Sequence, residues 1–500
     1  MKAITQIIKE KPWVGWVLFL ATIIIVFLFG LLASSIIERR SEALYAYKPS
    51  KEISQIEPRN RVWGENFPRE FESYLKTADT SFRSLYNGNA LIDMLELDPK
   101  MVLLWAGYPF SKDYNQPRGH YYAIDDMRNT LRTEAPMTAT SGKMPNTCWT
   151  CKSPDVPRIM SKFGISAFYK GKWASKGAEI VNFIGCADCH DAKTMNLRIS
   201  RPALIEAFER QGIDVKKATQ QEMRSLVCAQ CHVEYYFKGE DKYLTFPWDK
   251  GMNVDSIEKY YDSYEFSDWK HELSRAPMIK AQHPDYEIFK MGIHAQRGLA
   301  CVDCHMPYRS EGGVKFTDHH IQSPLNNITN TCQVCHRESE ETLRNNVYER
   351  QQKVYQTRDK AEELLVKAHI EAKAAWDAGA SETEMKPILI LIRHAQWRWD
   401  FATAGHGNAF HAPIEILRIL STSIDLSQEA RILTTRILAL HGVNKPIIYP
   451  DISSKAKAQK YIGLDIEKMK KEKQEFLNKV VPEWIKKANE REAKYTLKNL

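Results

Sequence analysis

The sequence predicts a mainly α-helical fold with little strand, in which an irregular region of short elements precedes a region of long helices. Three observations support this prediction. Five CxxC pairs lie in the irregular region and use all ten cysteines. The last third is charged and places apolar residues at helical spacing. The length of 500 residues suits one large domain beside that helical part.

An apolar run from Trp13 to Ile37 is the membrane feature of the N-terminus. As a helix it would span roughly 37 Å, enough to cross a bilayer with some tilt. Lys2, Lys9 and Lys11 precede it, so the positive-inside rule places the start in the cytoplasm and the body outside. Residues 1–40 are therefore an uncleaved anchor or, because LLASS offers small residues, a cleaved signal peptide.

The rest of the chain divides by composition into three parts. Residues 41–60 are polar and read as a linker, and residues 61–340 hold the CxxC pairs among recurrent Pro, Gly and aromatic residues. Residues 341–500 form a helical region that either packs within the chain or builds a dimer face. Helices are expected from about 338 to 378, 383 to 404, 414 to 440 and 465 to 491.

Four of the CxxC pairs continue into histidine, which is typical of covalent c-type haem attachment. Each pair would hold one haem through two thioethers, and the histidine would bind the iron. Structural zinc is the alternative, but zinc does not require a histidine directly after each pair. The four motifs consist of Cys186, Cys189 and His190; Cys228, Cys231 and His232; Cys301, Cys304 and His305; and Cys332, Cys335 and His336.

The first pair, Cys148 and Cys151, is followed by Lys152 instead of histidine. An amine binds iron only when it is deprotonated, so the site must lower its pKa by desolvation and by the charge of the iron. Four ordinary haems beside one unusual haem suggest four electron carriers and one reaction centre. The fold class is then a multihaem cytochrome c domain with little strand, followed by a long-helix C-terminal region.

Electron-transfer haems favour a second histidine on the far side of each iron. Eleven histidines lie outside the motifs, which exceeds the four that are needed, and spacing alone does not assign them. These are His120, His271, His283, His294, His319, His320, His369, His394, His406, His411 and His441.

The net charge of +8 is modest. It fits either an ordinary soluble surface or a field that concentrates an anionic substrate. Basic and acidic residues are interspersed and no groove-binding motif is present, so the sequence does not indicate a nucleic-acid binder.

Taken together, these motifs resemble the pentahaem cytochrome c nitrite reductase family, the ammonia-forming type. The resemblance covers about residues 60–500 and rests on four CxxCH motifs, one CxxCK placed first in CWTCKSPDVP, export, and a helical C-terminal third. It implies six-electron reduction of nitrite to ammonium at the lysine-ligated haem, fed by four bis-histidine haems. It also implies a homodimer, a membrane multihaem quinol dehydrogenase as electron donor, and a location in the periplasm or on the outer face of the cytoplasmic membrane.

The resemblance further implies roles for individual residues. The active-site arginine matches Arg132 in TLRTEAP, the tyrosine matches Tyr235 in HVEYYF, and the histidine matches His283 in IKAQHPDYE. Taken singly, these residues could equally be a surface charge, a packed aromatic and a polar loop residue. A calcium ion is implied beside the Lys152 haem, held by Glu234, Gln282 and the carbonyls of Tyr235 and Lys280. Distal iron ligands match His120, His294, His319 and His411, with His406 as the alternative to the last.

Two other functions are compatible with the motifs. A related multihaem enzyme that converts hydroxylamine or sulfite is the enzymatic alternative, although those enzymes usually carry more haems. A pure electron conduit is the non-enzymatic alternative, and it would need no open iron, so a sixth ligand from the protein opposite Lys152 would support it.

Overall fold

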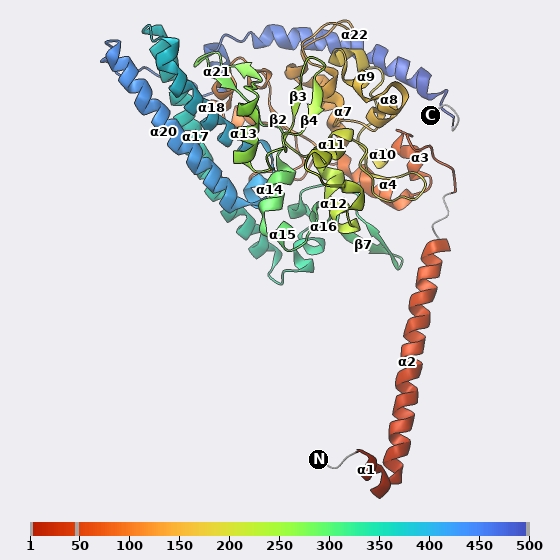
Figure 1. The fold of residues 1–500 in the computed structure, drawn as a ribbon. Coiled ribbons are helices and arrows are strands. Elements are labelled where there is room, and N and C mark those ends of the chain that lie inside the picture. Colours follow the sequence, from red (N-terminus) through yellow and green to blue (C-terminus); the bar gives the residue numbers. More distant parts are fainter. Residues whose placement is uncertain (1–3, 46–49, 497–500) are drawn as a thin grey trace. The chain divides into compact units, whose positions relative to one another are not determined.

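The computed structural model describes residues 4–45 and 50–496, and the chain forms two compact units, Met1–Glu52 and Ile53–Leu500 (Figure 1). The first unit consists of α1 (Ile4–Glu10) and α2 (Pro12–Tyr45). Helix α2 continues past the expected start of the linker. Lys2, residues 46–49 of the expected linker and residues 497–500 lie outside the described residues.

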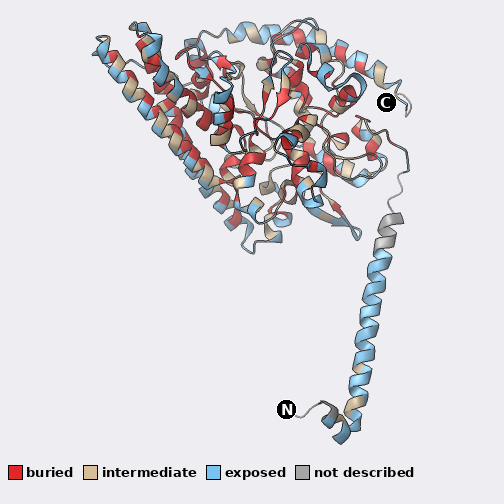
Figure 2. Cartoon of the chain, in the orientation of Figure 1, coloured by how far each residue is buried: buried red, intermediate tan, exposed pale blue. Residues whose placement is uncertain are grey.

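The apolar segment of α2 has the length and composition of a membrane span, Pro12–Arg39. Most of the large side chains between Trp13 and Ile37 are exposed, as Figure 2 shows, and Phe29 is 67% exposed. A helix that is hydrophobic all round and packs against no core suits a lipid environment. An N-terminal signal sequence has the same properties, so both alternatives from the sequence remain.

The first part of the second unit is built from short elements, as the sequence predicts. Its helices are α3 (Asn60–Gly64), α4 (Pro68–Leu75), α5 (Met94–Leu97), α6 (Lys100–Leu104), α7 (Ala123–Asn129), α8 (Asp155–Phe163), α9 (Ile165–Tyr169), α10 (Cys186–Cys189), α11 (Pro202–Arg210), α12 (Gln220–Ala229), α13 (Val254–Ser263), α14 (Asp285–Met291), α15 (Ile293–Gln296) and α16 (Cys301–His305).

Strand content is small, and every described strand pairs with one neighbour in an antiparallel ribbon. The ribbons are β1 (Ile92–Asp93) with β2 (Asn115–Gln116), β3 (Tyr236–Lys238) with β4 (Tyr243–Thr245), β5 (Trp269–Lys270) with β6 (Pro277–Met278), and β7 (Tyr308–Glu311) with β8 (Val314–Thr317). In the β3–β4 ribbon, Tyr236 pairs with Thr245.

The long helices of the C-terminal part confirm that aspect of the predicted fold. Helices α17, α18 and α20 lie side by side in Figure 1, and α22 runs across α7. Polar caps start them: the Ser339 hydroxyl accepts from Thr342 N at α17, and Ser381 and Glu384 form a capping box at α18. The bounds are α17 (Glu340–Asp377), α18 (Glu382–Ala404), α19 (Asn408–His411), α20 (Pro413–Leu440), α21 (Lys455–Tyr461) and α22 (Ile466–Glu492).

The core joins the long helices to the short-element region. Trp105, after α6, packs against Trp399 of α18 with ring centroids 5.6 Å apart, and both indoles are almost fully buried. Large aromatic side chains bury enough apolar area to hold short helices that would not be stable alone. The long helices therefore share one core with the short-element region that carries the CxxC motifs.

Candidate haem and substrate site

The four CxxCH histidines each face one of the predicted distal histidines. An iron bound by two imidazoles needs ring centroids about 6.3 Å apart, from two metal–nitrogen bonds of about 2 Å and the ring radii. The observed separations are 6.1 Å for His232 and His120, 6.1 Å for His190 and His319, 6.4 Å for His336 and His294, and 6.3 Å for His305 and His411. Each pair thus has the spacing that a haem iron requires.

Hydrogen bonds orient several of these rings. A metal-binding histidine usually donates its second ring N–H to a carbonyl or carboxylate, which leaves the other nitrogen free for the metal. The Nδ1 atoms lie 2.8 Å from Met195 O in His190, 2.9 Å from Gln322 O in His305 and 2.7 Å from Thr317 O in His319. In His232 the partner is a carboxylate oxygen of Asp285, at 3.3 Å.

Burial lowers the pKa of each of the four predicted distal histidines, which favours the neutral form that a metal ligand must have. It lowers the pKa of His120 to about 3 and the pKa of His411 to about 4. The Nδ1 atoms of both rings are buried and find no hydrogen-bond partner among the described residues. Buried polar atoms without a partner are rare and indicate a group that the chain alone does not supply. The donor sets therefore fit haem iron.

His406 and His411 occupy different places. His411, in α19, faces the ring of His305, whereas the backbone carbonyl of His406 accepts a hydrogen bond of 3.0 Å from Asn87 Nδ2. The close approach of Gly292 to the His411 carbonyl, where a Cβ would lie 1.9 Å away, fixes the position of the α19 backbone. The geometry favours His411 as the partner of His305.

The cysteines of different motifs lie against one another, which gives the order of the haem sites. The Cys151 thiol contacts the Cys231 thiol, and Cys228 contacts Cys301. Cys189 is a charge neighbour of Cys231, and Cys304 is a charge neighbour of Cys332. The Cys228 motif is therefore a branch point, near the Lys152, Cys186 and Cys301 motifs, and the Cys332 motif lies near the Cys301 motif.

The CWTCK turn is held by stacked indoles. Trp149 lies in the 3-10 turn Asn146–Trp149, stacks on Trp173 at 4.6 Å, and donates through Nε1 to Trp173 O at 2.9 Å. The Lys152 backbone N–H donates to Trp149 O at 3.0 Å. This arrangement gives Lys152 a fixed backbone position next to the two thiols.

Arg132 lies on a 3-10 turn, Leu131–Thr133, that follows α7. The turn begins at Thr130, whose hydroxyl accepts from Arg132 N at 3.3 Å and donates to Asp113 Oδ2 at 2.8 Å. The guanidinium lies 4.4 Å from the centre of the Phe110 ring. Its positive charge lowers the pKa of Cys148, although burial of that thiol raises it more strongly. The turn and the Phe110 ring thus place a permanent cation near the first CxxC pair.

Tyr235 and His283 approach the same region from two loops. Their ring centroids are 6.4 Å apart. Burial raises the pKa of Tyr235 well above its usual range, and burial together with the Lys152 ammonium lowers the pKa of His283 well below its own. Both groups are neutral hydrogen-bond donors near neutral pH, and the Lys152 charge reaches His283. The structure therefore brings Lys152, Tyr235 and His283 together, with Arg132 beside Cys148.

The residues predicted to hold calcium also converge. Glu234 Oε2 accepts from Gln282 N at 2.6 Å, and the Gln282 side-chain amide lies 2.9 Å from Lys280 O. Burial raises the pKa of Glu234 well above its usual range, so its negative charge needs a counter-ion. A carboxylate, an amide oxygen and backbone carbonyls are the oxygen donors that calcium prefers. The donor set fits this cation.

Several residues beside the site carried no signal in the sequence. Phe110 lies 22 positions before Arg132, and Asp285 differs from any other acidic residue only by its place in the fold. The buried hydroxyl of Tyr108 bonds to Gln282, and its ring stacks on Phe110 at 5.5 Å. Such contacts depend on chain segments that meet only in the folded protein.

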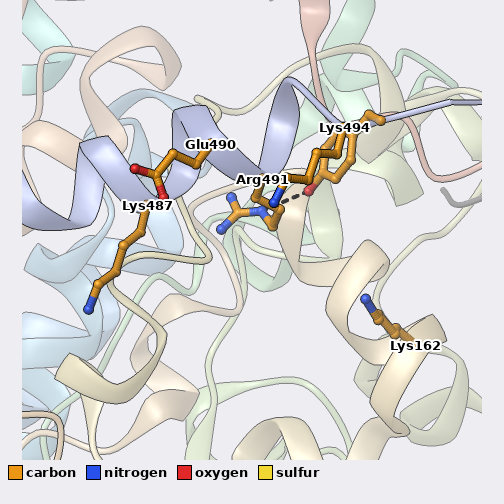
Figure 3. A pocket seen from close by; sticks show the side chains of 6 residues that line it. Lys162, Lys487, Glu490, Arg491 and Lys494 are labelled. Atoms are coloured by element: carbon orange, nitrogen blue, oxygen red, sulfur yellow. Dashed lines mark hydrogen bonds between the residues drawn. The ribbon is translucent and has the colours of Figure 1, made fainter.

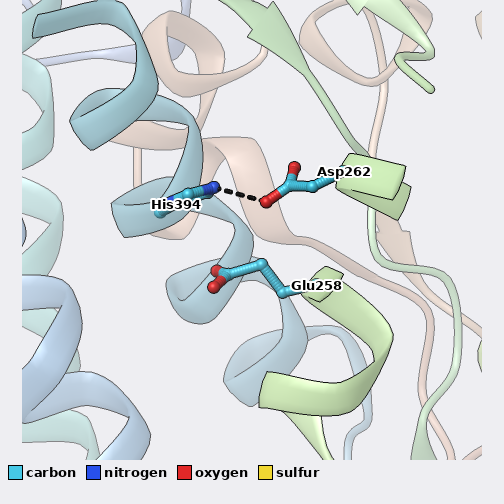
Figure 4. Close-up of side chains that lie close together, drawn as sticks. All are labelled: Glu258, Asp262 and His394. Carbon is cyan, nitrogen blue, oxygen red and sulfur yellow. Dashed lines mark hydrogen bonds and ion pairs between the residues drawn. The ribbon is translucent and has the colours of Figure 1, made fainter. Parts of the chain in front are cut away.

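Two further features lie away from these motifs. Figure 3 shows an open hollow of about 400 Å³ with Lys162 and Lys487 on opposite sides, and its Arg491 already donates to Ala178 O at 2.6 Å. Figure 4 shows Glu258, Asp262 and His394, which could hold a metal ion. The Asp262 carboxylate, however, pairs with Arg393 at 3.1 Å, and Glu258 pairs with Arg398.

Comparison with known proteins gives consistent matches over nearly the whole chain. A family model described as cytochrome c552 matches residues 59–494. Cytochrome c-552 of Parabacteroides distasonis is 62% identical over 483 residues, which cover 96% of this chain and 98% of that protein. Cytochrome c-552 of Bacteroides fragilis is 60% identical over 481 residues, with 96% and 98% coverage.

A solved structure matches the fold as well. Cytochrome c nitrite reductase from Desulfovibrio desulfuricans aligns with a TM-score of 0.72 and 32% identity, covering 84% of this chain and 91% of that chain. The catalytic subunit of that enzyme contains two calcium sites that are relevant to its structure.

Proposed function

The chain belongs to the cytochrome c552 family and shares the fold of a cytochrome c nitrite reductase, and from this premise we propose that it reduces nitrite to ammonium. Six electrons and eight protons convert one nitrite ion into one ammonium ion and two water molecules. Cys148 and Cys151 would hold a c-type haem, which would supply one-electron redox chemistry at this site. The observation that carries the proposal is the convergence of Lys152, Tyr235 and His283 beside a fixed Arg132.

Lys152 would be the axial ligand of this haem in place of histidine. Its amine binds iron only without its proton, and the positive iron favours that deprotonated form. The indole stack of Trp149 and Trp173 holds the backbone at Lys152 beside the two thiols, and the Lys152 amine would hold the iron in place of a histidine.

The substrate is a small anion, and three side chains on the open side suit it. Arg132 offers a permanent charge and a planar set of N–H donors. Tyr235 and His283 are half-buried and neutral, and they can donate hydrogen bonds to the nitrite oxygens without carrying charge into the pocket. As negative charge develops on those oxygens, the two groups can pass protons to them.

Calcium would act on this pocket through residues that are adjacent in sequence to Tyr235 and His283. Glu234 and Gln282 each precede a pocket residue, Tyr235 and His283, by one position. An ion held by Glu234, Gln282 and the carbonyls of Tyr235 and Lys280 would fix both backbones at once and add positive charge near the substrate. The calcium sites named for the Desulfovibrio desulfuricans enzyme support this assignment.

Electrons would reach the Lys152 haem through four bis-histidine haems. The thiol contacts support a route in which the Cys332 and Cys301 motifs lead to the Cys228 motif, which lies against Cys151. We propose a membrane multihaem quinol dehydrogenase as donor. Helix α2 supports a location in the periplasm or on the outer face of the cytoplasmic membrane, as an anchored or an exported chain.

We also propose that two copies of the chain form a homodimer through the long helices. Helix α20 packs against α17 and α18 on one side and exposes Ile414, Ile432 and Leu440 elsewhere. Large exposed apolar residues on a long helix favour a helix from a second copy as partner. Sedimentation at micromolar concentration should give twice the monomer mass for wild type, and a monomer after Ile432→Glu would support this face.

The function is tested by Lys152→His in purified, fully haem-loaded protein. We expect the variant to keep all its haem and to change its rate of nitrite turnover, because the axial ligand sets the electron density at iron. Arg132→Ala and His283→Ala should impair turnover with haem content intact. If all three variants kept the wild-type kinetics, the assignment of these residues to a nitrite pocket would be wrong. An electron conduit, or a related enzyme for hydroxylamine or sulfite, would then be favoured.

A further inference from the structure

The carboxylate of Asp285 bonds to the haem-binding histidine at the branch point of the haem sites. Asp285 Oδ2 lies 3.3 Å from Nδ1 of His232. The residue follows His283 by two positions at the start of α14, and its backbone N–H donates to His283 O at 2.6 Å. The next residue, Tyr286, donates from its backbone N–H to His232 O at 3.1 Å. Two backbone contacts thus fix the carboxylate beside the ring.

This arrangement differs from those of the other CxxCH histidines. His190 and His305 bond through Nδ1 to neutral backbone carbonyls, and among the four CxxCH histidines, all within the described residues, His232 is the one with a carboxylate partner. A carboxylate is a stronger acceptor than a carbonyl and carries a full negative charge. It therefore increases the electron donation of His232 toward the iron more than a carbonyl would.

Packing keeps the Asp285 carboxylate in place. Its Oδ1 lies so close to Gly405 that a Cβ there would be 2.5 Å away, and the same Cβ would be 2.5 Å from Asn408 Oδ1. The titratable groups near Asp285 are His232, His283, Glu287, Cys301, His305, His406 and His411. The Asp285 carboxylate is therefore held in place beside His232, and a larger residue at position 405 would push it away.

We propose that Asp285 is a positioning residue that lowers the reduction potential of the haem held by Cys228, Cys231 and His232. The redox change is the gain of one electron by the ferric iron to give the ferrous iron. A more electron-rich His232 stabilises the ferric form, so the haem becomes a stronger reductant. The inference rests on the proposed function in one respect: this motif contacts Cys151, so the added driving force is directed at the Lys152 site.

The test is a spectroelectrochemical titration of the holoprotein without nitrite, comparing wild type with Asp285→Asn. The variant keeps the size of the side chain and loses the charge. We expect the reduction potential of one haem to rise by at least about 59 mV. This shift corresponds to a tenfold change in the equilibrium constant of a one-electron reduction. That haem is identified by the low-spin signal that disappears in a His120→Ala variant, because His120 faces His232.

Three further variants complete the design. Asp285→Glu should return the potential toward wild type, and Gly405→Ala, which pushes the carboxylate away, should raise the potential of the same haem. Asp303→Asn is the matched control, because this carboxylate lies in another CxxCH motif and pairs with Arg224 instead of a histidine. If Asp285→Asn gives no holoprotein, Gly405→Ala decides by the same criterion.

The proposal is overturned if the haem opposite His120 shifts no more than in Asp303→Asn, or if all haems shift equally. Its failure is distinct from failure of the proposed function, because the titration contains no substrate. A shifted potential in a protein that forms no ammonium would leave the role of Asp285 standing and remove nitrite as its purpose.

Discussion

The imidazole rings of His305 and His411 lie 6.3 Å apart, centroid to centroid, although 106 positions separate them in the chain. This spacing suits two nitrogens on one iron, with bonds of about 2 Å each. His406 is close in sequence and offers the same chemistry, so only the fold distinguishes the two candidates.

The first prediction follows from this pair. His411→Ala should leave the iron of the Cys301 motif with one protein ligand and convert that haem from low spin to high spin. His406→Ala is the control and should keep four low-spin bis-histidine haems. Electron paramagnetic resonance of the oxidised holoproteins makes the measurement. Conversion in His406→Ala instead of His411→Ala would reverse the assignment.

The second prediction concerns the ring beside Arg132, the proposed active-site arginine. The Arg132 guanidinium lies 4.4 Å from the centre of the Phe110 ring, within the range of a cation–π contact. Arg132→Lys keeps the charge but loses the planar set of donors, so we expect kcat/KM for nitrite to fall about 10–100-fold, the worth of one charged hydrogen bond. Arg61→Lys, at an exposed position of α3, should leave kcat/KM unchanged. Equal values for Arg132→Lys and wild type would contradict the role of Arg132.

The third prediction concerns calcium. Burial raises the pKa of Glu234, so without a cation the folded protein disfavours the carboxylate form that would bind calcium. Calcium at about 100 times its Kd should add about 2.7 kcal/mol to the free energy of unfolding, seen as a higher Tm. Glu234→Gln should abolish this gain, while Asp262→Asn, in the cluster already paired with Arg393, should keep it. A calcium response that survives Glu234→Gln would place the ion elsewhere.

The fourth prediction is a pH dependence that originates in α22. The Lys473 ammonium donates to Arg128 O at 3.2 Å and to Thr133 Oγ1 at 3.0 Å, on either side of the Arg132 turn. Burial lowers the pKa of Lys473 to about 7, against the raising effect of Asp113 and Glu134. The unfolded chain keeps the ordinary lysine pKa, so between about pH 7 and 10 it binds more protons than the folded chain.

Stability should therefore rise with pH across this window, by up to about 2–3 kcal/mol between pH 7 and 9, and should not change from this group below pH 7. The measurement is Tm at pH 6, 7, 8 and 9 for wild type and Lys473→Met. The rise should be smaller in the variant. Lys479→Met, an exposed lysine of the same helix paired with Glu475, should follow wild type. Parallel curves for wild type and Lys473→Met would refute the assignment.

The long helices and the scarcity of strand could be predicted from the sequence because their causes are local. Ser339 and Ser381 cap the first turns, and apolar spacing marks one face of each helix. The observed α17 begins at Glu340 and ends at Asp377, close to the expected 338 and 378. Helix α2 is different: it continues to Tyr45, because ERRSEALY contains good helix formers and no breaker, although its polarity indicates a linker.

The cysteine motifs could likewise be found by eye, since each is one short run of residues. The partners of those motifs could not be found in this way. The pairing of His120 with His232, the order of the haem sites and the contact of Asp285 with His232 join distant segments. Spacing along the chain carries no information on such contacts, and a resemblance to a family provided the expected residues that the geometry then brought together.

The reduction of nitrite to ammonium is measured as the yield of ammonium per nitrite consumed, with purified holoprotein and a reduced viologen as electron donor. We expect one ammonium for each nitrite, with six viologen radicals oxidised. Fully haem-loaded protein that oxidises viologen slowly, or that consumes nitrite without forming ammonium, would contradict it.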